Sequence, residues 1–237
     1  MKTDPNTWTH WKKQLINEIK KLGMRHGISE VFDDLVTMIA LTISNTSTGI
    51  DFDKREKQYL DIINKYATEE QKQFATMFAY LVKSMNYSLP EYRDILGEIY
   101  EELSMNSKDL SQFFTPRHVA LLMAKITGAD SSGEIIKENG FVTLCEPTCG
   151  SGVLVLAYAE MLANNKYNPS AHMCVTAIDL SLKCVFMTYV QLSYYGIPAV
   201  VIHGNGLTFE EHSRWYTPAY LLGNWACKCN SQVDGKN

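Results

Sequence analysis

The sequence predicts an α/β protein, in which an N-terminal helical domain is followed by part of a parallel sheet. Apolar residues recur at helical spacing over the first half of the chain, and short apolar runs alternate with helical segments over the second half. Strands that alternate with helices form right-handed β-α-β units, so the strands lie parallel. We expect a helical domain at residues 1–110 and a sheet domain at residues 111–237.

Four helical segments are expected in the first domain, because its apolar residues follow one face of a helix. They recur over residues 8–22, 31–41 and 74–85. Pro90 is expected to open the fourth segment, which runs to Ser104, since proline is favoured in a first helical turn.

The second domain is expected to alternate helices and strands. In chain order the expected elements are a helix at 117–127, a strand at 141–144, a glycine turn at 146–152, a helix at 153–164, a strand at 174–178, a helix at 182–195, a strand at 199–202 and a fourth short strand at 219–222. A polar tail is expected to follow the fourth strand.

The composition excludes several classes of protein. Of 237 residues, 46% are hydrophobic and 20% are charged, which excludes disordered and fibrous chains. No stretch suits a transmembrane helix, and the first residues lack the apolar core of a secretory signal. The cysteines therefore indicate reduced thiols and a cytoplasmic protein, and the pairs Cys145–Cys149 and Cys227–Cys229 depart from the usual spacing of zinc ligands. A net charge of −4 argues against a chain that binds nucleic acid alone.

Glycine-rich or polar turns follow three of the expected strands. In a parallel sheet, ligands bind beyond the carboxyl ends of the strands. The first strand leads into a turn of the form E-P-x-x-G-S-G, whose glycines let a ligand approach the backbone at a helix N-terminus. Asp179 follows the second strand, where a carboxylate can accept hydrogen bonds from a ribose diol, and Asn205 follows the third. This arrangement is typical of a site for an adenosine-containing cofactor.

The spacing of the glycines narrows the choice of cofactor. The turn lacks the spacing of the dinucleotide fingerprint, and no lysine follows it as in a phosphate-binding loop. These features argue against NAD and ATP. They favour S-adenosylmethionine, whose amino-acid end needs no phosphate cradle.

Two further motifs precede the glycine turn. Leu96-Gly97-Glu98-Ile99-Tyr100-Glu101 matches a helix of the form L-G-x-x-Y-E, and Gln112-Phe113-Phe114-Thr115-Pro116 matches an F-x-T-P element. Over residues 90 to 210 the chain resembles the N6-adenine DNA methyltransferases, especially the modification subunits of type I restriction–modification systems. The resemblance implies a methyltransferase-type, Rossmann-like sheet of strand order 3-2-1-4 with helices on both faces. Strand 4 would then be an exposed edge.

The resemblance also implies roles for individual residues. Thr115, flanked by Phe114 and Pro116, would lie near the methionine carboxylate of S-adenosylmethionine. Asp179 would bind the ribose hydroxyls, and Asn205 would lie near the adenine. The binding turn would comprise Glu146, Pro147, Gly150, Ser151 and Gly152. No metal is expected, and the target adenine of DNA would be flipped out of the duplex.

Several of these residues also suit ordinary structural roles. Asp179 suits a cap of the following helix, and Asn205 suits a turn beside glycine. Thr115-Pro116 suits a plain helix start, and Asn224 suits a turn.

The catalytic tetrapeptide of the family, of the form [N/D]-P-P-[Y/F], does not occur in this sequence. Asn224 stands where its first residue is expected, but Trp225-Ala226-Cys227 replaces the rest. The prolines and the aromatic ring position the target amino group, and loss of positioning raises the barrier to methyl transfer.

Two functions therefore remain open. The first is a DNA adenine-N6 methyltransferase of a restriction–modification system that needs a partner or a missing segment for catalysis. The second is a catalytically inactive homologue that binds the cofactor or has a regulatory role. The expected partners are DNA, reached through a specificity or modification subunit, and other chains in a homo- or hetero-oligomer. No membrane partner is expected.

Overall fold

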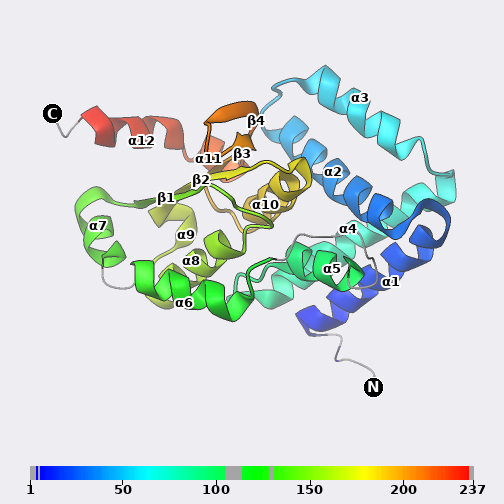
Figure 1. Cartoon of the computed structure of the whole chain (residues 1–237), viewed down its shortest axis with the longest axis horizontal. Coiled ribbons are helices and arrows are strands. Elements are labelled where there is room, and N and C mark those ends of the chain that lie inside the picture. The colour runs from blue at the N-terminus through cyan, green and yellow to red at the C-terminus, as the bar shows by residue number, and fades with distance from the viewer. Residues whose placement is uncertain (1–3, 5, 105–113, 129–130, 235–237) are drawn as a thin grey trace. The chain divides into compact units, whose positions relative to one another are not determined.

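The computed structural model describes residues 4, 6–104, 114–128 and 131–234. The chain divides into two compact units, Met1–Phe114 and Thr115–Asn237. The expected domain boundary at residues 110 and 111 lies outside the described residues, as do Gln112 and Phe113. Figure 1 shows the first unit in blue to blue-green and the second in green to red.

The first unit is helical. It contains α1 (Trp8–His26), α2 (Ile28–Ser47), α3 (Phe52–Ile63), α4 (Thr68–Ser88) and α5 (Ile95–Ser104). Helix α1 packs against α4 and α2, and α3 packs against α2. The start of α1 is capped by the Thr7 hydroxyl, which accepts a hydrogen bond from the backbone N–H of His10.

Helix α5 begins at Ile95 and not at Pro90, so the expected start of the fourth helix is wrong. Asp94 explains the later start, because its carboxylate accepts a hydrogen bond of 2.9 Å from the backbone N–H of Gly97. An aspartate in this position caps a helix N-terminus. The apolar side chains of Ile95 and Ile99 are then fully buried.

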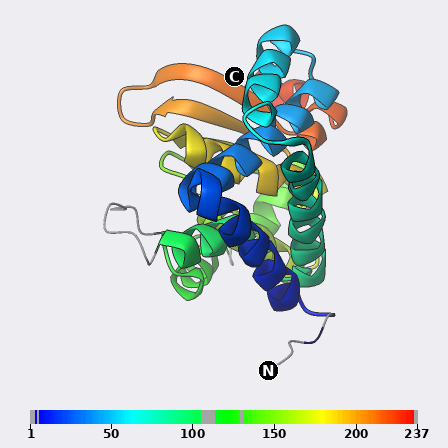
Figure 2. The ribbon, with the colours of Figure 1, turned by 90° about the vertical axis from the view of Figure 1, so that its right-hand side faces the viewer.

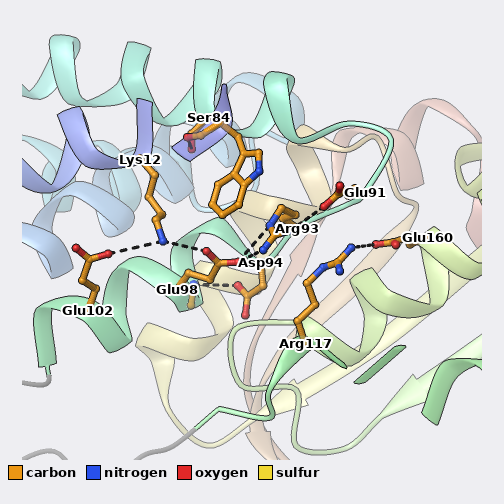
Figure 3. Close-up of polar contacts among 11 residues, drawn as sticks. Lys12, Ser84, Glu91, Arg93, Asp94, Glu98, Glu102, Arg117 and Glu160 are labelled. Carbon is orange, nitrogen blue, oxygen red and sulfur yellow. Dashed lines mark hydrogen bonds and ion pairs between the residues drawn. The ribbon is translucent and has the colours of Figure 1, made fainter. Parts of the chain in front are cut away.

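Charged side chains connect α1 with α5 and with the segment before it (Figure 3). Lys12 pairs with Glu98 at 3.0 Å and with Glu102 at 3.6 Å. Arg93 pairs with Glu98 at 3.2 Å, and its guanidinium lies 4.0 Å from the centre of the Trp8 ring. The two ends of the first unit are therefore joined by ion pairs and a cation–π contact.

The second unit is an α/β fold, as expected. Its elements are α6 (Arg117–Gly128), α7 (Ser132–Asn139), β1 (Val142–Glu146), α8 (Val153–Asn164), α9 (Pro169–His172), β2 (Met173–Asp179), α10 (Leu182–Tyr194), β3 (Ala199–Asn205), β4 (Glu210–Tyr216), α11 (Pro218–Leu222) and α12 (Trp225–Asp234). Strands β1, β2 and β3 are adjacent and parallel, with Glu146 beside Ala177 and Asp179 beside His203. Helices α7, α9 and α12 and strand β4 are not among the expected elements, and neither is α3 in the first unit.

The fourth strand differs from the expectation. Residues 219–222 belong to α11, because Pro218 occupies the first helical position and the Thr217 hydroxyl caps the helix at the N–H of Tyr220. Strand β4 instead pairs antiparallel with β3, and the sheet has the order β1-β2-β3-β4. The expected placement of strand 4 beside strand 1 is therefore wrong, and the sheet is mixed. Figure 2 shows β3 and β4 as neighbouring orange ribbons.

Helix α8 forms the centre of the helical layer in the second unit. Nine of its twelve residues are buried, since it packs against both β1 and α6. Gly128 of α6 allows this helix to approach α8 closely, because a Cβ atom there would lie 2.4 Å from the terminal methyl of Met161 on α8. Arg117 of α6 pairs with Glu160 of α8 at 2.6 Å (Figure 3). These contacts hold the helix that follows the glycine turn.

Among the described residues, no helix combines the length and apolar character that crossing a membrane requires.

Candidate functional site

The carboxyl ends of the three parallel strands meet on one side of the sheet. Glu146, Asp179 and Asn205 are the last residues of β1, β2 and β3. Because neighbouring parallel strands end at the same side, the structure brings these three polar residues together.

The glycine turn after β1 has a backbone that requires glycine. Gly150 and Gly152 have φ values of 54° and 97°, a region that side chains with a Cβ rarely adopt. The turn is closed by a hydrogen bond of 2.8 Å from the N–H of Gly152 to the carbonyl of Cys149. A second bond of 2.8 Å, from the N–H of Cys149 to the carbonyl of Ile178, ties the turn to β2.

Cys149 lies buried at the base of this turn. Burial raises the pKa of its thiol well above the usual range, because a thiolate is poorly solvated there. The thiol therefore stays protonated and donates a weak hydrogen bond of 3.8 Å to the carbonyl of Gly150, which argues against a nucleophilic role.

Asp179 holds the glycine turn as well as the start of the next helix. One carboxylate oxygen accepts a hydrogen bond of 2.8 Å from the N–H of Gly150, and the other accepts one of 2.8 Å from the N–H of Ser181. Asp179 therefore does not cap α10, whose N-cap residue is Ser181, but it fixes the backbone directly before that helix. A carboxylate oxygen has two acceptor positions, so each oxygen can accept a further hydrogen bond from a ligand.

Asn205 shapes the loop after β3. Its side-chain oxygen accepts hydrogen bonds from the N–H groups of Leu207 at 2.9 Å and Thr208 at 3.3 Å, which forms an Asx-type turn. The next residue, Gly206, lies against the turn after β1, since a Cβ atom there would be 2.3 Å from the carbonyl oxygen of Pro147. The loops after β1 and β3 therefore touch.

Glu146 is half-buried at the end of β1. One oxygen of its carboxylate accepts a hydrogen bond of 3.2 Å from the N–H of Thr148, within the turn. The carboxylates of Glu146 and Asp179 together make this side of the sheet favourable for a positively charged ligand.

Two side chains of α10 contact the backbone of the glycine turn, and the sequence analysis does not identify them. The hydroxyl of Thr188 donates a hydrogen bond of 2.9 Å to the carbonyl of Gly150, and the amide of Gln191 donates one of 2.8 Å to the carbonyl of Ser151. Both side chains are fully buried. Their only signal in the sequence is that they are polar residues within a mostly apolar helix.

Large apolar side chains lie exposed beside these polar groups. Leu180, directly after Asp179, is 65% exposed, and Leu207 in the loop after β3 is 89% exposed. Exposed apolar side chains next to a polar cluster are a common feature of ligand sites.

Asn224 lies at the opposite ends of the strands. The residue that follows it, Trp225, packs on Phe141 with ring centres 4.9 Å apart and lies in one buried cluster with Cys174. Phe141 precedes β1 and Cys174 is near the start of β2, so this cluster marks the amino ends of the strands. The structure therefore does not bring Asn224 together with Glu146 and Asp179. Asn224 has a φ of 52° between α11 and α12, a turn position.

The F-x-T-P element spans the boundary between the two units. Phe114 belongs to the first unit, where its N–H donates a hydrogen bond of 3.3 Å to the Glu101 carboxylate. Thr115 and Pro116 begin the second unit, and the carbonyl of Pro116 accepts from the N–H of Val119 at the start of α6. Their roles toward the cofactor stay predictions.

The cysteines considered for zinc are not gathered in one place. Cys145 lies near the carboxyl end of β1 and is exposed to solvent. The Cys229 sulfur instead lies 3.4 Å from that of Cys174 at the amino ends of the strands. Over the part of the chain that the structure describes, no group of three or more His, Cys, Asp or Glu residues could hold a metal ion.

Comparisons with known proteins give the following result. The family model described as N-6 DNA methylase matches residues 91–214. A comparison with curated protein sequences finds no match. Among solved structures, a Listeria monocytogenes protein described as a class I S-adenosylmethionine-dependent methyltransferase is 14% identical with a TM-score of 0.40. The match covers 73% of this chain and 54% of that chain, so this chain spans about half the length of that protein.

Proposed function

Because the chain belongs to the N-6 DNA methylase family, we propose that it acts in S-adenosylmethionine-dependent methylation of DNA adenine at N6, within a restriction–modification system. The cofactor of this family is S-adenosylmethionine. The observation that carries the proposal is the convergence of the glycine turn, Asp179 and the Asn205 loop at the carboxyl ends of three parallel strands.

The residues present fit this cofactor. At Gly206 a Cβ atom would collide with the backbone of the turn, so the two loops form a cradle that only glycine permits. S-adenosylmethionine carries a positive charge on sulfur, which suits the carboxylates of Glu146 and Asp179. The turn at residues 146–152 contains no lysine or arginine, so it lacks the cations that usually accompany a phosphate group.

Each part of the cofactor would have its own binding group. Asp179 would accept hydrogen bonds from the ribose hydroxyls, and Asn205 with the exposed Leu180 would bind the adenine. The turn residues Pro147, Gly150, Ser151 and Gly152 would surround the amino-acid end, and Phe114-Thr115-Pro116 would approach the methionine carboxylate. When bound, the cofactor supplies an electrophilic methyl group.

Methyl transfer also requires that the adenine amino group be positioned. The sequence contains no [N/D]-P-P-[Y/F] tetrapeptide, and Asn224 lies at the amino ends of the strands. We therefore propose that the groups that hold the flipped adenine come from a partner or a further segment. A specificity or modification subunit would also supply contacts to DNA, since this chain has a net charge of −4. A cytoplasmic location and a homo- or hetero-oligomer are part of this proposal.

A catalytically inactive homologue that binds the cofactor is the second candidate. The position of Asn224 favours it, because a turn residue beside a buried tryptophan has no access to the carboxyl ends of the strands.

Calorimetry with S-adenosylhomocysteine tests the cofactor site. We expect binding to the purified chain and none for NAD or ATP at the same concentration. Absence of heat with millimolar S-adenosylhomocysteine would contradict the proposed site.

A methyl-transfer assay separates the two candidates. With tritiated S-adenosylmethionine and adenine-rich DNA, we expect no label in N6-methyladenine from the chain alone, because misplacement of the amino group by about 1 Å costs about a hundredfold in rate. Label that is lost in Asn224→Ala would refute this expectation and make Asn224 a catalytic residue.

A further inference from the structure

Helix α10 contacts the glycine turn through two buried polar side chains. Thr188 and Gln191 are one helical turn apart, and each donates to a carbonyl of consecutive residues, Gly150 and Ser151. The methyl and hydroxyl of Thr188 also lie 3.4 Å and 3.1 Å from where a Cβ of Gly152 would be. One face of α10 therefore contacts the whole Gly150-Ser151-Gly152 segment.

The contacts from α10 restrict a segment whose backbone is intrinsically mobile. Glycine adopts positive and negative φ with similar ease, so the peptide groups between Gly150 and Gly152 can rotate as units. In a planar trans peptide the carbonyl and the following N–H point in opposite directions. By holding the Gly150 carbonyl toward α10, Thr188 directs the N–H of Ser151 away from α10.

The second peptide of the segment is held at both ends. Its carbonyl, from Ser151, accepts from Gln191, and its N–H, from Gly152, donates to the carbonyl of Cys149 at 2.8 Å. Asp179 holds the preceding N–H, that of Gly150. Four hydrogen bonds thus determine which backbone groups of the turn face outward from the sheet.

We propose that Thr188 and Gln191 are positioning residues, which fix the two peptide groups of the glycine turn in the orientation that binds the cofactor. This inference rests on the proposed function. It identifies residues that act through the turn backbone and not by contact with the ligand. Without the hydrogen bonds from Thr188 and Gln191 the turn peptides can rotate. Ligand binding must then order them, and this entropic cost weakens the affinity.

Isosteric substitutions test the proposal. Thr188→Val and Gln191→Met keep the shape of the side chain and remove the donor, while Thr188→Ser keeps the hydroxyl. Ser193→Ala is the matched control, because Ser193 is on the same helix and its buried hydroxyl has no hydrogen-bond partner among the described residues. The readouts are the affinity for S-adenosylhomocysteine, the melting temperature without ligand, and amide hydrogen exchange over residues 147–154.

We expect Thr188→Val and Gln191→Met each to weaken binding about tenfold, the equivalent of one lost hydrogen bond. Thr188→Ser should restore the affinity, and Ser193→Ala should leave it unchanged. A purely structural role would lower the melting temperature and leave the affinity of the folded protein intact. Wild-type affinity in folded Thr188→Val and Gln191→Met would overturn the proposal.

Hydrogen exchange separates this proposal from the proposed function. If the wild-type chain binds no S-adenosylhomocysteine, the proposed function fails, and the exchange of ligand-free protein decides the present inference. Faster exchange over residues 147–154 in Thr188→Val, with wild-type exchange in Thr188→Ser, supports it. Equal exchange in the wild type and both variants overturns it.

Discussion

The two ends of the same parallel strands are built from different kinds of residue. At the carboxyl ends, Asp179, Thr188 and Gln191 hold a glycine turn by hydrogen bonds to its backbone. At the amino ends, Trp225, the first residue of α12, lies in an apolar cluster with Phe141 and Cys174. Backbone that is held by polar side chains can present its own groups to a ligand, whereas an apolar cluster excludes one. We therefore place the proposed site at the carboxyl ends, whereas the amino ends stabilise the fold.

Replacement of Trp225 by alanine should give the largest effect and should be confined to stability. Trp225 is 2% exposed and makes an edge-to-face contact with Phe141. We expect the free energy of unfolding, measured in urea, to fall by about 3–5 kcal/mol, the usual cost of such a truncation. Phe209→Ala is the control, because Phe209 is 81% exposed. Weaker binding of S-adenosylhomocysteine by folded Trp225→Ala would contradict the division between the two ends.

Asp179→Ala should act mainly on ligand binding. It removes the acceptor for the N–H of Gly150 and the proposed acceptor for the ribose hydroxyls. We expect calorimetry to show a loss of about 1–3 kcal/mol in binding free energy, the usual cost of leaving a hydrogen-bond partner unsatisfied. Asp61→Ala is the control, because it removes an exposed carboxylate on α3. If both variants bind S-adenosylhomocysteine with equal affinity, Asp179 does not contribute to the binding site.

Gly206→Ala should separate the two loops at the carboxyl ends. Its new methyl group would lie 2.3 Å from the carbonyl oxygen of Pro147, so one loop must move. We expect about tenfold weaker binding of S-adenosylhomocysteine, equivalent to about 1.4 kcal/mol. Gly133→Ala is the matched control, since the nearest atom there is 3.3 Å away. If both glycine variants bind alike, contact between the loops does not shape the site.

Thiol labelling should give the smallest effect and should distinguish the two ends without any substitution. Cys145 and Cys227 are exposed, whereas burial raises the pKa of the Cys174 thiol well above its usual range. Because the thiolate is the reactive form, we expect a maleimide to modify Cys145 and Cys227 and to spare Cys174. S-adenosylhomocysteine should slow labelling of Cys145 beside the turn more than that of Cys227 on α12. Mass spectrometry of the digested protein measures the labelling rate of each cysteine. If S-adenosylhomocysteine slows the labelling of Cys145 and Cys227 equally, the result contradicts a site at the carboxyl ends.

The strands next to the glycine turn could be predicted because their signals are local. Residues 141–144, 174–178 and 199–202 are short apolar runs, and the turn at 146–152 needs two glycines for its backbone. Strand β4 was missed because its sequence, EEHSRWY, is mostly charged or polar, as suits the outer strand of a sheet. The short apolar run at 219–222 is typical of a strand, but Thr217-Pro218 directly before it is a helix start.

The expected location of Asn224 depends on the expected strand at 219–222. If residues 219–222 were a parallel strand, Asn224 would come at its carboxyl end. Because β4 is antiparallel to β3, the chain returns to the amino ends of the strands before α11 begins. Thr188 and Gln191 were missed for another reason: a polar residue in an apolar helix shows that a partner is needed but not which one.

The tryptophans are distributed so that each unit carries its own fluorescence reporter. Of the four tryptophans, Trp8 and Trp11 belong to the first unit, while Trp215 and Trp225 belong to the second. The Arg93 guanidinium lies over the Trp8 ring and pairs with Glu98 of α5, so the emission of that ring reports on this contact. Replacing one pair of tryptophans by phenylalanine would leave emission from a single unit. Denaturation followed in this way would resolve whether the two units unfold together or in sequence.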